Sequence, residues 1–322
     1  MGVVVRGNFP QLVKKDLYGY FFETYDSIDA VYPRIFEVVK SDAPYEQGTT
    51  AVGMGLLSER QEGEHIRFHD PAEGRNWYIR NHSYSDGFIL SDELLRDTND
   101  RKLTNLIQET ARTWAESVRQ TEETFCAQLL NQGAMTAGDP AFNASIPALF
   151  DDPSGDLIYD SKSFFNADHR SLLGGSYNNY AASAGLDESN LSAAYQAVAD
   201  TNAHNERDVK VKITPDVLLV PPALGFTAHK LLDSTLVPGG ALNDANALKG
   251  LLEPIVWRYL SDTDGWFVGQ AKKGLRFLDR ESPIIDVWQE PETKQWKCTM
   301  TRRFGAGVTN WRFWRAANIA SS

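Results

Sequence analysis

Residues that could carry chemistry occur along the whole chain, but few of them have the spacing that a reaction needs. His65 and His69 are four residues apart, which on a helix would place both imidazoles on one face and suit a metal ion. They lie instead in a segment where apolar and polar residues alternate, which is typical of a strand. His169, His204 and His229 each lack a nearby Cys or a second His. We therefore interpret the histidines as structural and predict no metal site.

The short glycine motifs are incomplete versions of those that bind phosphate. The Gly-Met-Gly motif at 53–55 lacks the Lys-Ser/Thr pair that completes a phosphate-binding loop, and the Gly-Ala-Gly motif at 305–307 is equally short. No Gly-x-Ser-x-Gly segment is present to form a nucleophile elbow. Asp151 and Asp152 stand before a Pro-Ser-Gly sequence and are most simply a solvated turn. The residues thus predict neither a catalytic site nor a cofactor.

The composition is that of a globular protein with an acidic surplus. The formal net charge is −11 over 322 residues, which argues against a dedicated nucleic-acid binder because such a surface needs a local excess of Lys and Arg. The pairs at 272–273 and 302–303 are too small to form that patch. No apolar run approaches the roughly 20 residues of a membrane-spanning helix, and residues 1–10 do not resemble a signal peptide. We expect a protein made and used in the cytoplasm, with Cys126 and Cys298 reduced and buried.

The strongest local pattern in the sequence spans residues 97–133. Apolar residues recur there at spacings of three and four, Thr98 or Asn99 can serve as the N-cap, and Gly133 can end the helix. We predict one helix, roughly 50 Å long, with one buried stripe and one solvated face. The predicted stripe is Leu103, Leu106, Ile107, Ala111, Trp114, Val118, Phe125 and Leu129, and the predicted polar face is Arg112, Glu116, Arg119, Gln120 and Glu123.

Residues 1–48 have the composition of an arm that cannot fold alone. They carry many aromatic residues and three prolines, which interrupt any long helix. The piece 11–25 is predicted to be a short amphipathic helix. Such a segment is too apolar to stay solvated and too short to make its own core. We expect it to lie on the rest of the chain or on a neighbouring copy.

Residues 49–92 are predicted to form a long two-stranded hairpin. Segment 64–69 alternates in polarity and is expected to pair with the extended run 77–84, around a turn at 70–74 that contains Pro and Gly. An isolated two-stranded hairpin is at best marginally stable in water. The hairpin therefore also needs a partner surface.

Shorter elements follow the long helix. Residues 134–185 are rich in Gly, Ser, Asn, Asp and Pro, and we expect loops around short strands. The predicted helices are 186–201 and 223–234, and the predicted strands are 216–220, 255–260, 265–271, 275–278, 284–289, 296–304 and 309–317. Residues 236–249 form a Gly/Asn/Asp/Ala-rich loop. The fold class is therefore α+β, with one dominant long helix.

Several ordered motifs in the second half of the chain resemble a known family. Residues 213–234 combine a strand, a Pro-Pro pair and a helix, and they look like the corresponding segment of tailed-bacteriophage major capsid proteins of the Mu-like head-subunit group. The motifs similar to the final strands of that group are Trp-Phe-Val at 266–268, Gly-Leu-Arg-Phe-Leu at 274–278, Arg-Glu-Ser-Pro at 280–283 and Arg-Arg-Phe-Gly-Ala-Gly-Val-Thr-Asn-Trp at 302–311. The resemblance covers residues 95–322 in order and spacing, and the preceding part by architecture.

The resemblance implies the capsid fold of the Hong Kong 97 phage type, and the predicted segments fit its parts. The implied domains are an N-arm at 1–48, an E-loop hairpin at 49–92, a peripheral (P) domain at 93–185 and 279–322 with spine helix 97–133, and an axial (A) domain at 186–278. Two surfaces are implied to contact other subunits. Their residues are Asp70, Pro71, Glu73 and Gly74 at the E-loop tip, and Pro238, Gly239, Gly240, Asn243 and Asp244 in the A-domain loop at the capsomer centre.

The resemblance also implies a function without catalysis. The chain is expected to assemble, in the host cytoplasm, into the pentamers and hexamers of an icosahedral head shell that encloses double-stranded DNA in the virion. The expected partners are further copies of the chain, a portal protein and weakly, non-specifically contacted DNA. Because residues 49–95 contain no lysine, an isopeptide bond from an E-loop lysine is not available. We expect a shell held non-covalently, with room for a decoration protein, and a separate scaffolding protein because no charged helical extension precedes the arm.

Two other functions remain open on the sequence. The first is the shell of a nanocompartment with the same fold, which would enclose an enzyme instead of DNA. A cargo-binding pocket or a neighbouring cargo gene would favour it. The second is a cytoplasmic hydrolase with an unrecognised site, which would form a small defined oligomer rather than a megadalton particle.

Overall fold

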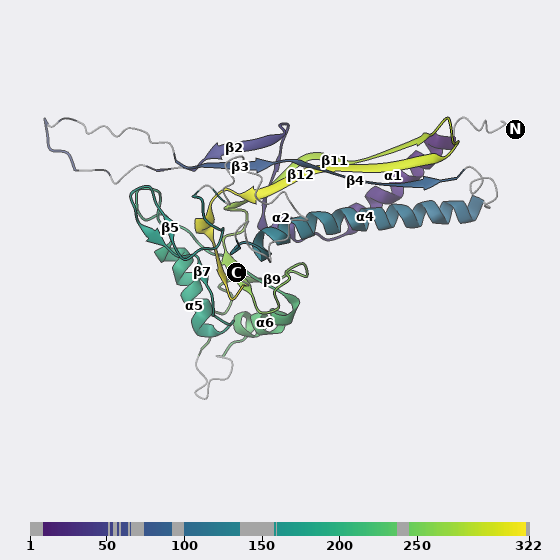
Figure 1. The fold of residues 1–322 in the computed structure, drawn as a ribbon. Helices are drawn as coiled ribbons and strands as arrows, with labels where there is room; N and C mark the ends of the chain where they lie inside the picture. The colour runs from purple at the N-terminus through teal and green to yellow at the C-terminus, as the bar shows by residue number, and fades with distance from the viewer. Residues whose placement is uncertain are drawn as a thin grey trace.

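A computed structural model describes residues 9–50, 52, 53, 57, 59–63, 65, 74–91, 100–135, 158, 160–236 and 245–319. The molecule is elongated (Figure 1): a long sheet and helix α4 (Asp100–Asn131) run side by side toward one end, and a smaller sheet with two helices forms the other. In the described part of the chain, no helix has the length and apolar character needed to span a membrane.

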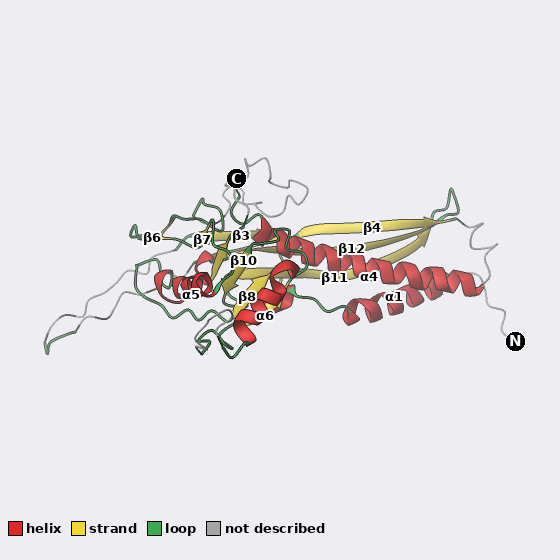
Figure 2. Cartoon of the chain, turned by 90° about the horizontal axis from the view of Figure 1, so that it is seen from below, coloured by secondary structure: helices red, strands yellow, loops and turns green. Residues whose placement is uncertain are grey.

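The larger sheet has the strand order β1-β11-β12-β4. β1 (Glu37–Lys40) is parallel to β11 (Leu275–Gln289), and β12 (Trp296–Val308) pairs antiparallel with both β11 and β4 (His82–Leu90). Helices α1 (Phe9–Ser27) and α4 cover one face of this sheet (Figure 2). Side chains alternate between the two faces of a strand, so every second residue faces the helices. The buried side chains of this layer are Leu17, Phe21, Tyr25, Ile107, Ala111, Trp114, Ala115, Val118, Ile285, Cys298 and Met300.

The N-terminal arm lies on its own chain. The helix predicted at 11–25 is α1, which packs along α4 and against β11. Leu17, Phe21 and Tyr25 are spaced by four residues, so they form one apolar stripe, and all three are buried. The described part of the arm therefore packs on the rest of its own chain, which is the first of the two predicted partners.

The strand Asn76–Arg80, β3, has a partner that the sequence did not predict. It pairs antiparallel with β2 (Tyr45–Thr49). Its predicted partner, 64–69, lies almost wholly outside the described residues, so that pairing stays a prediction. The predicted run 77–84 is split at Asn81, whose buried amide donates hydrogen bonds to the segment before β2. Beyond this point the chain continues as β4 in the larger sheet. β2 lies in the segment that the sequence assigned to the arm, so the arm supplies a partner strand that the sequence did not predict.

The smaller sheet has the strand order β7-β13-β10-β8-β9. Its central strand β10 (Trp266–Gly269) pairs antiparallel with β8 (Val217–Val220) and β13 (Trp314–Ala317). β7 (Tyr180–Ala181) and β9 (Glu253–Val256) form the edges and are parallel to their neighbours. Every residue of β8 and β10 is buried, because both faces of the sheet are covered. Helices α5 (Glu188–Gln196) and α6 (Gly225–Asp233) pack on one face.

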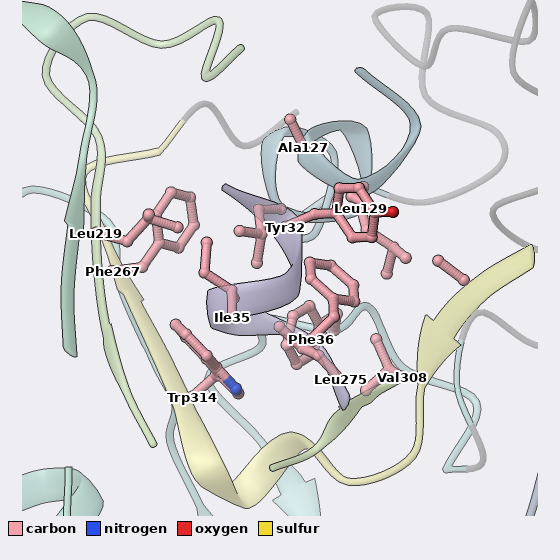
Figure 3. Close-up of a cluster of buried hydrophobic side chains, with 14 of the residues drawn as sticks. Tyr32, Ile35, Phe36, Ala127, Leu129, Leu219, Phe267, Leu275, Val308 and Trp314 are labelled. Carbon is pink, nitrogen blue, oxygen red and sulfur yellow. The ribbon is translucent and has the colours of Figure 1, made fainter. Parts of the chain in front are cut away.

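The other face of the smaller sheet contributes to a central core that the larger sheet shares (Figure 3). The short helix α2 (Tyr32–Ile35) and the following residue Phe36 lie in this core, between Phe267 of β10 and Leu275 of β11. Four of the eight tryptophans are fully buried, three of them (Trp257, Trp311 and Trp314) here. Phe36, which follows α2 and precedes β1, is fully buried as well. Burial of such a side chain contributes roughly 1.5–3 kcal/mol, so this part of the arm is an integral part of the fold.

The long helix predicted at 97–133 is confirmed as α4, with residues 92–99 outside the described part. Its predicted stripe is buried at Ile107, Ala111, Trp114, Val118, Phe125 and Leu129. Leu106, in contrast, is 41% exposed. Successive residues of a helix point roughly 100° apart, so Leu106 and Ile107 cannot both face the sheet. Ile107 has the buried position.

The remaining elements follow the prediction with local differences. Helix 186–201 is α5 followed by a π-helical turn, Ala197–Thr201, and Asp187 caps it by accepting from the Asn190 N–H at 2.8 Å. The predicted helix 223–234 begins one residue early, with the 3₁₀ turn Pro222–Leu224 before α6. The predicted strands 275–278 and 284–289 are one strand, β11, with two register shifts between them. The predicted strand 309–317 is a 3₁₀ turn, Trp311–Phe313, and then β13.

Candidate functional site

Most of the residues predicted at the two assembly surfaces lie outside the described residues. These are Asp70, Pro71 and Glu73 of the predicted E-loop tip, and Pro238, Gly239, Gly240, Asn243 and Asp244 of the predicted A-domain loop. The structure does describe the ends of the A-domain loop, where Leu236 and Ala245 form a β-bridge. The Asn246 amide donates to the carbonyls of Leu231 and Ser234, at 2.6 and 3.0 Å, and fixes this base on α6.

Gly74 is the residue of the predicted E-loop tip that the structure describes, and it lies beside Thr50 at the end of the β2–β3 pair. Its φ is not in the left-handed region, so a turn conformation does not explain the glycine. It packs instead on Thr50, where a Cβ atom would overlap the carbonyl oxygen. The neighbouring Arg75 accepts from the Thr50 N–H through its carbonyl at 2.8 Å, and its own N–H donates to Thr50 Oγ1 at 2.9 Å. Gly74 therefore allows the two strands to close at their end.

The hairpin base, which we define as β2, β3 and Gly74, is seated closely on the larger sheet. A Cβ atom on Gly305 would overlap the Arg80 carbonyl oxygen, and one on Gly307 would stand 2.6 Å from the Ile79 side chain. The Gly-Ala-Gly motif thus serves close packing of β3 on β12. The Arg276 guanidinium lies 5.1 Å from the Trp77 ring. These contacts hold the hairpin base in one orientation.

A buried polar cluster anchors the arm to the spine of the molecule, and Glu122 of α4 is its centre. The Tyr25 hydroxyl donates to the Glu122 carboxylate at 2.9 Å, and the Tyr32 hydroxyl at 3.4 Å. Arg119 contributes an ion pair to Glu122 at 3.1 Å and donates to the Tyr25 carbonyl at 3.2 Å. Burial and the adjacent Glu122 carboxylate raise the pKa of both tyrosines, so they remain hydroxyl donors. The cluster therefore binds both ends of the α1–α2 connection.

Arg302 of β12 completes this cluster from the sheet side. Its Nε lies 2.8 Å from the Glu122 carboxylate, and its Nη1 lies 2.5 Å from Asp279 and 2.5 Å from the Glu281 carbonyl. The last two partners flank the first register shift of β11, so the guanidinium occupies the place where regular strand pairing is interrupted. Burial acts to lower the pKa of Arg302, but Glu122 and Asp279 outweigh it and raise the pKa. This arginine is thus a structural ion, not part of a basic surface patch.

Glu123, the next residue of α4, is also buried but has different partners. Its carboxylate accepts from the backbone N–H groups of Val31 (2.5 Å) and Tyr32 (3.2 Å), and from the Trp257 indole. Burial raises the pKa of Glu123, and the three N–H donors oppose that shift. The sequence placed this residue on the solvated face, which is wrong. A carboxylate that accepts from three donors in one interior position joins the arm, α4 and the smaller sheet.

A second polar cluster lies where the chain segments beside the smaller sheet meet. His169 Nδ1 lies 2.5 Å from Asp160 Oδ2, and its Nε2 lies 3.1 Å from Asn179 Oδ1. The imidazole is stacked on Trp311, with ring centroids 4.2 Å apart. On the same segment, Arg312 and Glu206 form a buried ion pair at 2.8 Å. These side chains tie residues 160–179 and Glu206 to the 3₁₀ turn Trp311–Phe313, which leads into β13. The structural role predicted for His169 fits these contacts.

The two buried clusters fit a structural role. Across the described residues, no group of three or more His, Cys, Asp or Glu side chains could hold a metal ion. Cys126 and Cys298 are free and buried, as predicted, and burial raises the pKa of the Cys298 thiol to about 11. The polar atoms of both clusters are directed at other parts of the same chain. Their arrangement fixes the arm, the hairpin base and the two sheets relative to one another.

A weak signal for the first cluster is present in the sequence. Glu122 and Glu123 interrupt the three-and-four apolar spacing of the long helix between Val118 and Phe125, in a stretch with no buried apolar residue. A charged residue in such a gap, aligned with the buried stripe, is a candidate for a paired interior ion. Apart from Arg119, their partners come from residues 90 to 180 positions away. The pattern of one helix carries no information over such a distance.

The sequence matches a family model described as phage capsid protein over residues 79–317. Among solved structures, the chain is similar to that of Mycobacterium phage Patience, with a TM-score of 0.54 and 11% identity over 100% of this chain and 90% of that chain. It is similar to the capsid of cyanophage P-SCSP1u, with a TM-score of 0.53 and 10% identity over 91% and 89%. The capsid of a native GTA particle gives a TM-score of 0.53 and 12% identity over 92% and 94%. No curated protein sequence matches the chain.

Proposed function

The chain belongs to the phage capsid protein family, and we propose that it is the Mu-like major head subunit of a tailed phage, with a fold of the Hong Kong 97 type. The family match covers 239 of the 322 residues, from 79 to 317, and is the observation that carries the capsid assignment. The Mu-like subgroup is supported by the motifs at 213–234 and 266–311. A protein of this family is a shell-forming structural subunit of the virion capsid. The solved structures with which it shares its mixed helix–sheet fold are phage and GTA-particle capsids.

The proposed domains follow the architecture of the molecule. Residues 1–48 are the N-arm, 49–92 the E-loop, 93–185 and 279–322 the P domain with its spine helix, and 186–278 the A domain. The long helix α4 under the β11–β12 hairpin supports the P domain, and the smaller sheet supports the A domain. Strands β7 and β13 lie outside 186–278 but pair within the smaller sheet. We therefore assign these two strands to the A domain as well.

The proposed assembly consists of pentamers and hexamers around phage double-stranded DNA. The E-loop tip, with Asp70, Pro71 and Glu73, and with Gly74 where the loop joins the hairpin base, is proposed to lie on a neighbouring subunit. The A-domain loop, with Pro238, Gly239, Gly240, Asn243 and Asp244, is proposed to face the capsomer centre. The rigid seat of the hairpin base on β12 supports the first assignment, because a fixed base is needed to direct an extended loop outward. The fixed ends of the A-domain loop on α6 support the second.

The other proposed partners are a separate scaffolding protein, a portal protein, a decoration protein on the outside and packaged DNA in weak, non-specific contact. The acidic net charge of −11 supports weak DNA contact, since a shell that binds many phosphates through Lys and Arg would resist packaging. Assembly is proposed to take place in the host cytoplasm.

Co-expression with the scaffolding protein of the same phage, followed by negative-stain electron microscopy, tests the proposal. Closed shells of uniform size are expected, and DNA-filled particles are expected from infected cells. A small defined oligomer under all conditions would overturn the capsid assignment. Shells that enclose an enzyme and no DNA would favour the nanocompartment. Uniform shells from this chain alone would overturn the separate scaffold.

The proposed non-covalent shell has its own test. Residues 49–95 contain no lysine that could form an isopeptide bond from the E-loop. Mature particles boiled in detergent are therefore expected to give a single subunit band on a denaturing gel. A ladder of linked subunits would contradict this part of the proposal and leave the capsid function unaffected.

A further inference from the structure

A short hairpin beside the smaller sheet presents two leucines to solvent. Strands β5 (His169–Arg170) and β6 (Ser176–Tyr177) are antiparallel, and their hairpin projects from the body of the molecule (Figure 1). Leu172 and Leu173 form its tip and are 47% and 69% exposed. A single exposed leucine is ordinary, but two adjacent ones at the end of a projection form a patch that water solvates poorly.

The tip has a fixed conformation. The Ser171 N–H donates to the Gly175 carbonyl at 3.0 Å, and the Gly174 N–H donates to the Ser171 carbonyl at 3.1 Å. The Ser171 hydroxyl oxygen accepts from the Gly175 N–H at 2.9 Å. Gly174 has a φ of 96°, a conformation that side chains of other residues rarely allow. The two leucines are therefore held on a closed turn.

The turn is also attached to the buried interior. Glu206 accepts from the Leu172 N–H at 3.3 Å with one oxygen and pairs with the buried Arg312 at 2.8 Å through the other. On the far strand, the Tyr177 hydroxyl donates to Asp208 at 2.8 Å. A Cβ atom on Gly175 would stand 2.5 Å from the same Asp208 carboxylate. The tip is thus pre-organised, which reduces the entropy that binding has to overcome.

The charged side chains of the hairpin strands and of the residue before them, Arg170 and Asp168, pair with each other. Arg170 and Asp168 form an ion pair at 3.2 Å, and Asp168 also accepts from the Ser176 hydroxyl at 2.6 Å. Each copy of the chain carries a formal net charge of −11, so most pairs of surfaces from two copies repel one another. A surface that is apolar and internally neutralised avoids this repulsion. The tip is therefore suited to contact between copies.

We propose that the Leu172–Leu173 tip is a preformed contact that is buried against an apolar surface of a second copy of this chain. The proposal rests on the proposed shell function, in which every subunit is surrounded by identical copies. The contact is heterologous, because the tip of one copy meets a different surface of the next. Such contacts close into rings when the rotation between copies is the right one. The rigid turn supplies the same geometry in every copy.

Thiol labelling of a Leu173→Cys variant tests the contact. The two natural cysteines are buried, and burial raises the pKa of Cys298 to about 11 and that of Cys126 well above the usual range, so an introduced thiol is the reactive one. The thiol introduced at the tip is expected to react rapidly with a maleimide in the free subunit. In assembled shells the reaction is expected to slow by at least about tenfold, since burial removes the thiol from solvent. Dissociation of the shells into folded subunits, without denaturant, must restore the labelling rate of the free subunit, because Cys126 and Cys298 stay buried only in the folded chain.

A matched pair of variants provides the second measurement. Leu172→Ser together with Leu173→Ser is expected to reduce shell yield and to leave the melting temperature of the free subunit unchanged. Val211→Ser, which alters another exposed apolar residue, is expected to assemble normally. Equal labelling of the introduced thiol in free subunits and intact shells, or wild-type yield of the double Ser variant, would overturn the contact alone. A wild-type chain that forms no shell with its scaffold would overturn the proposed function and, with it, this contact.

Discussion

Two adjacent glutamates in the interior of α4 have opposite electrostatic surroundings. Glu122 faces the guanidinium groups of Arg119 and Arg302, so its charge is compensated by cations. Glu123 instead accepts hydrogen bonds from the N–H dipoles of Val31, Tyr32 and Trp257. Charged groups that lose water need compensation of one of these kinds. In both arrangements the carboxylate holds the arm. Because the compensation differs, we expect the stability of the subunit to respond differently when each cluster is substituted.

Arg302→Met is expected to destabilise the subunit by about 3–5 kcal/mol, because it leaves Glu122 buried with one cation fewer and empties the irregular part of β11. Urea denaturation of the free subunit measures this. Arg303→Met is the control, since its ion pair with Glu281 is part-exposed and such pairs contribute at most about 1 kcal/mol. The double variant Glu122→Gln, Arg302→Met is expected to recover part of the loss. Equal effects of the two arginine substitutions would contradict the assignment.

The pH dependence of stability isolates Glu123. Burial raises its pKa in the folded chain, so the folded state binds the proton more tightly than the unfolded state. The contribution of this group to stability is complete below the unfolded-state pKa and is lost as the pH rises through the raised, folded-state value. The free energy of unfolding of the wild type, relative to Glu123→Gln, is therefore expected to fall as the pH rises above the usual range of a glutamate carboxyl. A difference that stays constant or grows with pH would sink this interpretation.

At the scale of elements, glycines decide how closely the strands approach. Gly305→Ala on β12 is expected to destabilise the subunit by about 1–3 kcal/mol, because the new methyl group meets the Arg80 backbone and forces the strands apart. Thermal unfolding of the free subunit measures the loss. Gly19→Ala is the matched control: nothing lies within 4 Å of its Cβ position, in α1. It is expected to stabilise that helix by about 0.5–1 kcal/mol.

Elements with their own periodicity were predictable from the sequence, and pairings between distant segments were not. The spacing of Ile107, Trp114 and Val118 was enough for α4, and the apolar spacing of 186–201 was enough for α5 and the turn that follows it. The pairing of β2 with β3 depends on hydrogen bonds between distant residues, such as those of Thr50 and Arg75. Alternation in either strand does not specify that register. Glu123 was misplaced for the same reason, since its partners belong to the arm and to Trp257.

At the scale of the whole molecule, the buried clusters and the central core join the arm, the hairpin base and both sheets into a defined subunit. The apolar side chains that stay exposed on this subunit are then available for contacts between copies. These include the Leu172–Leu173 tip and exposed apolar residues of β4 and β11, among them Ile89 and Trp288. A subunit with a rigid body and directed apolar projections can repeat one set of weak contacts many times.

The net charge of −11 per copy makes the assembly reaction sensitive to salt. Subunits with the same charge repel over a distance set by the Debye length, which falls from about 30 Å at 0.01 M to about 8 Å at 0.15 M ionic strength. The proposed contacts are mainly apolar, so screening removes repulsion and weakens little of the attraction. The rate of shell formation, followed by light scattering, is therefore expected to rise across this range. Assembly that slows steadily as salt increases would mean that ion pairs between subunits, and not apolar contacts, dominate the interfaces.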